Sequence, residues 1–475
     1  MQKTQDYILD YTRLAAQRQY TGLVREHLAR THETPPLALV HSFGCQQNAA
    51  DGEKLRGMLA EMGYGFTDAL EEADFIIYNT CAVRENAEKR VFGTVGALKQ
   101  YKRQKPGLLI ALVGCMTQQQ SVADRLKRSY HHVDIVAGAD AWASLPERIY
   151  QALCQGKRSI KTEGEEPDTI VEGLPTRRAG WPKAWVSVMY GCNNFCSYCI
   201  VPYVRGRERS RAPEDILDEV KGLLDHGCKE INLLGQNVNS YGKDLKNGWD
   251  FPRLLREICA LSGDFLVRFM TSHPKDASEE LFDAMAASPK VAHHLHLPFQ
   301  CGNDRVLKAM NRGYTAQQYL EKVAALRARI PDIVLTSDVI VGFPGETTAE
   351  FEDTLKLIEA VRFDALFTFI YSPRPGTPAA TWPDLLSPEE KQANFQRLVD
   401  VQNQISKEIH EGYVGKTFRC FIDGKGTDKR NNLTARTNSG RLVHLTGDEA
   451  LIGTYQDLTI TSATTWALFG EAADE

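Results

Sequence analysis

Three cysteines lie within eight residues of the chain, at a spacing that suits an iron–sulfur cluster. Cys192, Cys196 and Cys199 follow the pattern C-x3-C-x2-C. Three thiolates on one short loop can ligate three corners of a cubane 4Fe–4S cluster and leave the fourth iron open. An open iron can bind a small molecule, which a cluster with four cysteine ligands does not do. The alternatives are a zinc site, which would need a fourth Cys or His nearby, and three cysteines packed in a core.

Three further cysteines, far apart in the sequence, each follow a predicted strand. Cys45, Cys81 and Cys115 come just after short apolar runs rich in β-forming residues. Because the carboxyl ends of parallel strands share one edge of a sheet, the three thiols could converge there on a second cluster, again with one iron unligated. The alternative is that cysteine fills three βα turns as a small packing residue. The residues alone leave both interpretations open.

The elements that must position these cysteines alternate between strand-length and helix-length segments, which predicts two parallel-sheet units. In the first unit, strands are expected at 37–43, 75–78, 108–113 and 133–136. In the second, they are expected at 184–190, 230–234, 266–270, 293–297, 334–341 and 365–371, with a closing helix over 389–411. Six such strands predict a partial (β/α)6 barrel of the TIM type. The C-x3-C-x2-C loop follows its first strand, where such barrels place their chemistry.

Short alternating strands at 418–422, 433–437, 442–445 and 456–461 predict a small antiparallel β-barrel at the C-terminus. We therefore predict an α/β multidomain protein. Its parts are a helical extension (1–35), an N-terminal α/β parallel-sheet domain (36–155), a polar linker (156–182), the partial barrel (183–411) and the small barrel (412–475).

Composition sets few further limits. The 475 residues are 43% hydrophobic and 25% charged, with a formal net charge of −5, ordinary values for a globular protein. No apolar run approaches the ~20 residues that span a bilayer, and the first residues lack the apolar core of a signal peptide. We therefore expect a cytoplasmic protein without a membrane segment, and a monomer. Stable disulfides among its eleven cysteines are not expected in that compartment.

The loop Cys192–Cys199 resembles the signature of the radical S-adenosylmethionine (radical SAM) superfamily. The resemblance implies that SAM binds the open iron. It also implies that an electron from flavodoxin or ferredoxin then splits SAM to give a 5′-deoxyadenosyl radical. The tyrosine before the last cysteine and the glycine-containing turns after the second and fifth barrel strands have counterparts in that superfamily. The contacts to SAM that this implies are Tyr198, Gly235, Gln236, Asn237, Arg312 and Gly342.

The segments around the other three cysteines resemble the N-terminal domain of the methylthiotransferase family of radical SAM enzymes. These segments are Phe43–Asn48, Asn79–Cys81 and Gly114–Cys115, and the resemblance covers residues 36–475. It implies that Cys45, Cys81 and Cys115 hold an auxiliary 4Fe–4S cluster, which carries the sulfur to be transferred. The enzyme would then use two clusters and two SAM molecules.

Two stretches, Asn79–Gly93 and Cys199–Arg211, are most similar to the isopentenyladenosine subgroup of that family (MiaB type). This implies methylthiolation at C2 of N6-isopentenyladenosine, next to the anticodon in the anticodon stem-loop of tRNA. The alternatives are the same chemistry on threonylcarbamoyladenosine or on an aspartate of a ribosomal protein. An alternative of another class is a non-catalytic RNA-binding iron–sulfur carrier or sensor, in which an open iron would be superfluous.

Two groups of basic residues suit contacts with RNA phosphates. Arg205, Arg207, Arg209 and Arg211 follow the radical SAM loop, although a solvated loop would look the same. Some of these arginines could instead serve the carboxylate of SAM or domain interfaces. The C-terminal barrel resembles the TRAM domain, an RNA-binding module, and carries seven basic against two acidic side chains between residues 416 and 441. A basic face also occurs without nucleic acid. The candidates for RNA contact in this barrel are Lys416, Arg419, Lys429 and Arg430.

One segment departs from the family pattern. Cys301 and Asn303 stand where the family shows two serines. The replacements could alter a contact with SAM or substrate, or they could simply be tolerated. His293, His294 and His296 precede them, and we expect hydrogen-bonded packing rather than ligation from these side chains. The cysteines that match no ligand position are Cys154, Cys228, Cys259, Cys301 and Cys420. We expect them to be core or surface thiols, with Cys301 as the one that could be an exception.

Overall fold

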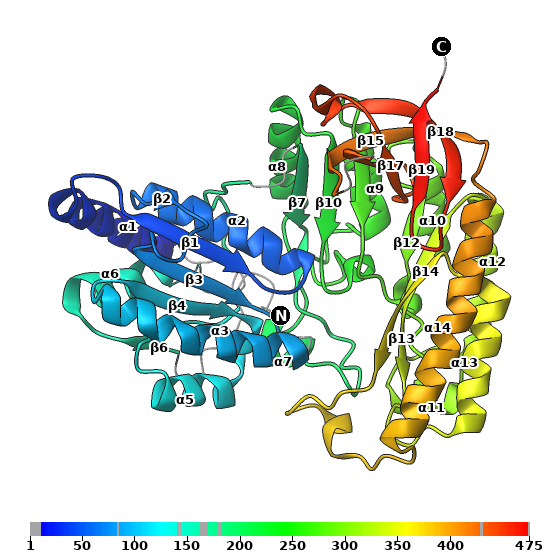
Figure 1. Ribbon diagram of the computed structural model, residues 1–475, viewed down its shortest axis with the longest axis horizontal. Coiled ribbons are helices and arrows are strands. Elements are labelled where there is room, and N and C mark those ends of the chain that lie inside the picture. Colours follow the sequence, from blue (N-terminus) through cyan, green and yellow to red (C-terminus); the bar gives the residue numbers. More distant parts are fainter. Residues whose placement is uncertain are drawn as a thin grey trace. The chain divides into compact units, whose positions relative to one another are not determined.

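A computed structural model describes residues 11–82, 85–139, 142, 144–161, 170–178, 182–427 and 431–473 (Figure 1). The chain forms two compact units. The first contains the chain up to residue 181 together with Ser187–Phe195 and Cys199–Asp215, and the second contains Pro182–Val186, Cys196–Tyr198 and Ile216–Glu475. The radical SAM loop is therefore shared between the two units, a division that the sequence did not indicate.

The first unit is a parallel sheet with the strand order β2-β1-β3-β4-β5-β6. The strands span Leu37–Ser42 (β1), Gly65–Phe66 (β2), Phe75–Thr80 (β3), Leu109–Gly114 (β4), Ile135–Val136 (β5) and Ser159–Ile160 (β6). Helices α1 (Tyr11–Thr31), α2 (Gln46–Glu61) and α6 (Leu145–Gln155) share one hydrophobic core against the sheet. Helices α3 (Glu85–Gln104) and α5 (Gln120–Ser129) share the core on its other face. In Figure 1 the blue and cyan strands accordingly lie between α2 and α3.

The pattern of burial explains why this sheet forms. Every residue of β3 and β4 is buried, as expected for parallel strands that are covered on both faces. The structure confirms the four expected strands and adds β2 and β6, whose two residues each are too short to give a sequence signal. Val24 and Leu28 of α1 are buried in the core, so this helix, which lies within the expected N-terminal extension, packs as a part of the first unit.

Two three-stranded parallel sheets form the barrel, in the orders β11-β10-β7 and β12-β13-β14. All six expected strands are confirmed: β7 (Lys183–Ser187), β10 (Glu230–Leu234), β11 (Leu266–Phe269), β12 (His294–His296), β13 (Val334–Val341) and β14 (Ala365–Ile370). A bridge between Val267 and Val291 links the two sheets. The α-helices of this series are α8 (Pro213–Asp225), α9 (Phe251–Ala260), α10 (Glu279–Ala286), α11 (Asp304–Ala309), α12 (Ala316–Arg329), α13 (Thr348–Val361) and α14 (Pro388–Glu411).

The remaining short elements lie in the connections. Beside the radical SAM loop are β8 (Met189–Tyr190), α7 (Val201–Arg205) and β9 (Arg209–Ser210), and α4 (Cys115–Gln118) follows β4. The 3-10 helices whose bounds lie within the described residues are η2 (Val238–Ser240), η3 (Pro274–Asp276), η4 (Pro378–Thr381) and η5 (Glu449–Leu451).

The C-terminal strands form a closed barrel in the order β15-β16-β17-β19-β18. They span Thr417–Lys425 (β15), Leu433–Thr437 (β16), Leu442–Leu445 (β17), Tyr455–Ala463 (β18) and Leu468–Ala472 (β19). Four of them were expected, and β19 closes the barrel. The small barrel packs at the amino ends of the large barrel's strands. Its Asp423 pairs at 2.9 Å with Lys183, the first residue of β7, and its Arg441 pairs with Asp364, just before β14.

Candidate active site

The first unit brings Cys45, Cys81 and Cys115 to one edge of its sheet. Each follows one of the strands β1, β3 and β4, which are neighbours in the sheet. The thiol of Cys81 forms a hydrogen bond with Cys45, and the charge of Cys45 acts on Cys115. Cys45 is exposed, whereas Cys81 and Cys115 are buried. The geometric part of the sequence prediction, convergence on the carboxyl edge, is what the structure shows.

Two glycines allow this close approach. Gly44 has φ +108°, and a Cβ there would lie 2.4 Å from the Cβ of Cys81 and 2.8 Å from its Sγ. Gly114 has φ +105°, and a Cβ there would lie 2.5 Å from the carbonyl oxygen of Thr80. Positive φ together with a steric limit requires glycine at both positions. These residues are part of the cradle around the thiols.

Two buried asparagines tie the turns together. Asn48 donates from Nδ2 to the carbonyl of Thr80 at 2.9 Å, and Asn79 donates from Nδ2 to the carbonyl of Asn48 at 2.8 Å. The thiol of Cys45 donates to Oδ1 of Asn48 at 3.5 Å. Buried polar groups that are satisfied in this way rigidify a site. Both asparagines belong to the motifs quoted for the family resemblance, and the structure gives them a bracing role.

The electrostatics at this edge favour a thiolate at Cys45. The hydrogen bond from Cys81, assisted by the Arg205 guanidinium, lowers the pKa of the Cys45 thiol to about 6. Burial raises the pKa of Cys115, although Arg205 opposes the shift. The thiolate is the metal-binding form of cysteine. A low pKa in one of three adjoining thiols therefore prepares the group for ligation.

These residues fit the iron–sulfur cluster that the sequence implies. The thiols of Cys45, Cys81 and Cys115 lie at one edge of the sheet, and that of Cys45 has a lowered pKa. A side chain at Gly44 would occupy the space beside Cys81. Within the described residues, no three His, Cys, Asp or Glu side chains are arranged to hold a single metal ion.

The part of the radical SAM loop that belongs to the first unit is held by backbone contacts. Gly191 has φ +78°, and a Cβ there would lie 2.0 Å from the carbonyl oxygen of Arg207. The Cys192 N–H donates to the carbonyl of Gly206 at 3.1 Å. The Asn193 N–H donates to the Glu208 carboxylate at 3.1 Å. The segment after the cysteines thus folds back on the segment that begins them.

Cys196 and Tyr198 belong to the second unit, where Arg312 contacts both. Nη1 of Arg312 lies 3.4 Å from the Cys196 Sγ and 3.4 Å from the Tyr198 hydroxyl, and Nη2 donates to the carbonyl of Pro298 at 2.6 Å. The guanidinium is buried. Arg312 therefore contacts an expected cluster ligand, Cys196, and an expected SAM contact, Tyr198. A cation at such a sulfur is one of the means by which a protein can tune a cluster.

Polar atoms without partners gather where SAM is expected. The Asn237 side chain follows β10, donates to Asp276 at 2.7 Å, and keeps a buried Oδ1 with no partner among the described residues. After β11, the buried Ser272 Oγ and His273 Nε2 are also unpartnered in that part of the chain. Burial lowers the pKa of His273 to about 2. Since its Nδ1 accepts the N–H of Lys275 at 3.1 Å, Nε2 carries the proton and can donate to a ligand. Sequence reasoning missed Ser272 and His273.

Cys301 and Asn303, the two departures from the family pattern, lie near the turn that follows β13, and Cys301 contacts Glu346 of that turn. The N–H of Gly342 donates to Glu346 at 2.6 Å, and burial raises the pKa of that carboxyl to about 7. The Cys301 thiol lies 3.7 Å from the other oxygen of Glu346. Asn303 caps α11 by accepting the N–H of Arg305 at 3.0 Å. Cys301 is 1% exposed, so both departures from the family pattern have structural roles.

The three histidines before that segment are hydrogen-bonded, as expected. His293 contacts Asp332 at 2.9 Å, and His294 contacts the Thr336 hydroxyl at 2.9 Å. His296 also contacts Thr336, at 3.0 Å, and its Nε2 lies 3.5 Å from the Asp338 carboxylate.

The edge strand β14 presents two exposed aromatic rings. Phe367 and Phe369 are 46% and 38% exposed, and they share a face of the strand because they are two residues apart. The Phe367 ring packs edge-on against His296 with their centroids 5.6 Å apart. Asp338 on β13 is the register partner of Phe367. This face joins apolar rings to polar groups, a combination typical of ligand sites.

The arginines after the radical SAM loop are mostly internal, which argues against the expected phosphate contacts for Arg205, Arg209 and Arg211. Arg211 forms a two-point ion pair with Glu172, with both distances 2.7 Å. Arg209 is 3% exposed. Arg205 pairs with Asp51 inside the first unit. Only Arg207 of the four is exposed, and its guanidinium stacks on Phe195 at 4.3 Å.

The basic side chains of the small barrel differ in their exposure and in whether they already form ion pairs. Lys416 is exposed and has no ion-pair partner among the described residues. Arg419 is exposed but pairs with Asp264 at 2.6 Å, and Arg441 is buried. Lys429 and Arg430 lie outside the described residues. Lys416 is thus the most available of the expected phosphate contacts in the described part of this barrel.

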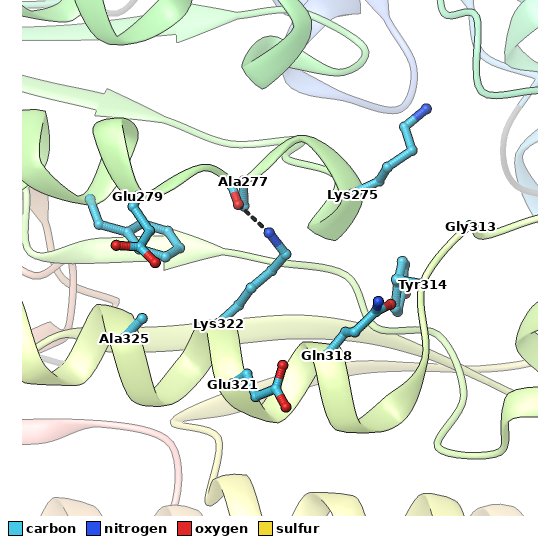
Figure 2. A pocket seen from close by; sticks show the side chains of 10 residues that line it. Lys275, Ala277, Glu279, Gly313, Tyr314, Gln318, Glu321, Lys322 and Ala325 are labelled. Atoms are coloured by element: carbon cyan, nitrogen blue, oxygen red, sulfur yellow. Dashed lines mark hydrogen bonds between the residues drawn. The ribbon is translucent and has the colours of Figure 1, made fainter.

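A pocket of the large barrel adjoins two of these groups (Figure 2). Its lining includes Tyr314, which accepts a hydrogen bond from Arg312 at 3.2 Å, and Lys275, whose backbone N–H donates to His273 at 3.1 Å. It has a volume of about 410 Å³ and lies between η3, α10 and α12. Figure 2 shows Lys322 reaching the carbonyl of Ala277, at 2.6 Å, and Glu279 is paired with Arg329 at 2.7 Å. Its charges are mixed and these polar groups already have partners, so it offers no built ligand site.

Three family models match the chain. "Radical SAM superfamily" matches residues 186–358, "Uncharacterized protein family UPF0004" matches 38–138, and "TRAM domain" matches 411–473. No helix in the described ranges has the length and apolar character needed to cross a membrane.

The chain is similar to curated proteins along most of its length. It is 50% identical over 434 residues to a tRNA-2-methylthio-N(6)-dimethylallyladenosine synthase of Acetivibrio thermocellus, covering 91% of this chain and 90% of the relative. It is 48% identical over 443 residues to the synthase of that name in Alkaliphilus oremlandii, covering 92% and 93%.

Among solved structures, the radical S-adenosylmethionine methyltransferase TsrM from Kitasatospora setae matches with a TM-score of 0.53 at 15% identity, covering 73% of this chain and 77% of that one. The cobalamin-dependent S-adenosylmethionine radical enzyme OxsB matches with a TM-score of 0.51 at 14% identity, covering 80% and 56%. These two likenesses show the fold alone.

Proposed function

The chain belongs to the radical SAM tRNA methylthiotransferase family, and from this premise we propose that it converts N6-isopentenyladenosine next to the anticodon of tRNA to its 2-methylthio derivative. The names of the relatives at 50% and 48% identity support this substrate. None of these relatives is named for threonylcarbamoyladenosine or for a ribosomal protein. A non-catalytic carrier or sensor has no support among them either.

The convergence of Cys45, Cys81 and Cys115 at adjacent strand ends carries the proposal. These thiolates would hold the auxiliary 4Fe–4S cluster, and the loop Cys192–Cys199 would hold the other. When bound, the two clusters and two SAM molecules supply the sulfur, the methyl group and the radical that removes hydrogen from an unactivated C–H bond. A flavodoxin or ferredoxin would supply the electrons.

The chain's own residues would bind and orient these groups. In this proposal the unpartnered Asn237 Oδ1 and the His273 Nε2–H receive polar groups of SAM. Because their orphaned atoms are buried, a ligand that pairs with them removes a desolvation cost of about 1–3 kcal/mol for each group.

The exposed face of β14 would receive the base. Flipped-out RNA bases stack on aromatic side chains, and Phe367 and Phe369 present two rings on one edge strand. The isopentenyl group would add apolar contact to the same rings. Asp338, half-buried beside them, could accept a hydrogen bond from the base.

The test compares three substrates under identical reducing conditions. The reconstituted enzyme is given tRNA with isopentenyladenosine, tRNA with threonylcarbamoyladenosine, or the ribosomal protein substrate, and methylthiolated product is measured by mass spectrometry. We expect product from the first alone. Product only from either of the others would refute the proposed substrate, and intact SAM in all three reactions would favour a carrier or sensor.

A further inference from the structure

Arg205 ends α7, six residues after the last cysteine of the radical SAM loop, yet its guanidinium lies at the other group of cysteines. Its Nε donates to the Cys115 Sγ at 2.9 Å. Its Nη2 contacts the Asp51 carboxylate at 2.7 Å and Oδ1 of Asn48 at 3.4 Å. Arg205 is 4% exposed and Asp51 is 1% exposed. All four residues belong to the first unit.

This arrangement is costly to build, because each buried ion loses hydration worth several kcal/mol. A packing role alone would be met by an apolar side chain of similar volume, which is often neutral or stabilising at such positions. The packing of Ile200 and Val204 with Cys115 and Ala82 already anchors α7 against the strand ends. The guanidinium therefore adds something other than packing, namely a positive charge and an N–H donor at a sulfur.

We propose that Arg205 is a positioning residue of the auxiliary cluster, which fixes the Cys115 sulfur and raises the reduction potential of that cluster. The inference rests on the proposed function, since it needs a cluster at Cys45, Cys81 and Cys115. An N–H donor withdraws electron density from a ligand sulfur, and hydrogen bonds and net charge are levers on cluster potential. Asp51 opposes this effect, because its negative charge partly cancels that of Arg205.

Arg205 links the two groups of cysteines because it follows one group closely in the sequence and contacts Cys115 of the other group. Only five residues separate Cys199 from Arg205, and α7 spans Val201–Arg205. The segment that carries one cluster's ligands therefore supplies the cation that acts on the other cluster's ligand.

The experiment measures the midpoint potential of the auxiliary cluster by a redox titration with electron paramagnetic resonance. The full chain carries Cys192→Ala, Cys196→Ala and Cys199→Ala, so that only the auxiliary cluster contributes to the signal. In this background we expect Arg205→Gln to move the midpoint to a more negative value. We expect Asp51→Asn to move it to a more positive value, because the guanidinium is then uncompensated. Arg207→Gln, an exposed arginine two residues away, should leave the midpoint unchanged.

The opposite signs of the two shifts decide the inference. No shift for Arg205→Gln, or shifts of the same sign for both variants, would overturn it. If Arg205→Gln assembles no cluster, then Arg205→Lys, which keeps the charge, and Asp51→Asn are measured instead. A positive shift for Asp51→Asn then supports the inference, and its absence refutes it. If the background protein itself binds no iron, the proposed function fails at an earlier point.

Discussion

The two groups of cysteines are built in contrasting ways. Cys192, Cys196 and Cys199 occupy one loop of eight residues, so their proximity follows from chain connectivity. Cys45, Cys81 and Cys115 are separated by more than thirty residues in each case, and three neighbouring strands bring them together. The first arrangement depends on local turns, and the second depends on the register of a whole sheet. The contrast shows that cysteines with no local spacing pattern can still be brought together by the order of strands in a sheet.

The largest expected effect comes from removing one group and keeping the other. Cys45→Ala, Cys81→Ala and Cys115→Ala together should lose about half of the iron, keep the formation of 5′-deoxyadenosine, and abolish methylthiolation. The matched variant, with alanine at Cys192, Cys196 and Cys199, should lose SAM cleavage instead. Iron analysis after anaerobic reconstitution and chromatography of the nucleoside products provide the measurement. Full iron retention in the first variant would mean that its cysteines only pack.

Glycine substitutions test whether each group depends on its own turn. Gly44→Ala places a methyl against Cys81, and Gly191→Ala places one against Arg207, so each should cost about 1–3 kcal/mol in unfolding free energy. We expect each variant to lose iron from one cluster only. Gly222→Ala in α8, where a Cβ meets nothing within 4 Å, is the control and should be neutral or slightly stabilising. Equal loss of both clusters in either variant would show that the two groups fold as one.

The aromatic face of β14 provides a prediction about substrate. Phe367→Ala should remove base stacking worth about 1–3 kcal/mol, which corresponds to a rise in KM for tRNA of roughly 5- to 150-fold. Leu385→Ala, at an apolar side chain that is 62% exposed, is the control. Steady-state kinetics with isopentenylated tRNA would distinguish the two variants. An unchanged KM for Phe367→Ala would remove this face from the base site.

The smallest expected effect concerns the small barrel. Lys416→Gln should weaken tRNA binding uniformly and reduce the slope of log affinity against log salt by about 1. Arg419→Gln should have less effect, because its guanidinium is already bound to Asp264. Filter binding over a range of salt concentrations measures both. The reverse ranking would show that RNA displaces the Arg419 ion pair.

Several features were predictable from the residues because their signals are local. The radical SAM loop, the six barrel strands and the small barrel follow from spacing and alternation along the chain. The two-residue strands β2 and β6 and the closing strand β19 were missed, since short strands are defined by their neighbours and not by their own pattern. The arginine cluster was misleading, because sequence shows charge but not burial, and Arg205, Arg209 and Arg211 are internal.

The sequence by itself indicated the kind of cofactor, because the C-x3-C-x2-C spacing of Cys192, Cys196 and Cys199 suits a 4Fe–4S cluster with one open iron. Tertiary structure alone decided that Cys45, Cys81 and Cys115 meet, and that Gly44 and Gly114 allow them to. It also placed the guanidinium of Arg205 on a sulfur that lies 90 positions away in the chain. The physical reason is that a parallel sheet aligns the ends of strands distant in sequence, and charge and burial at that edge depend on which strands become neighbours.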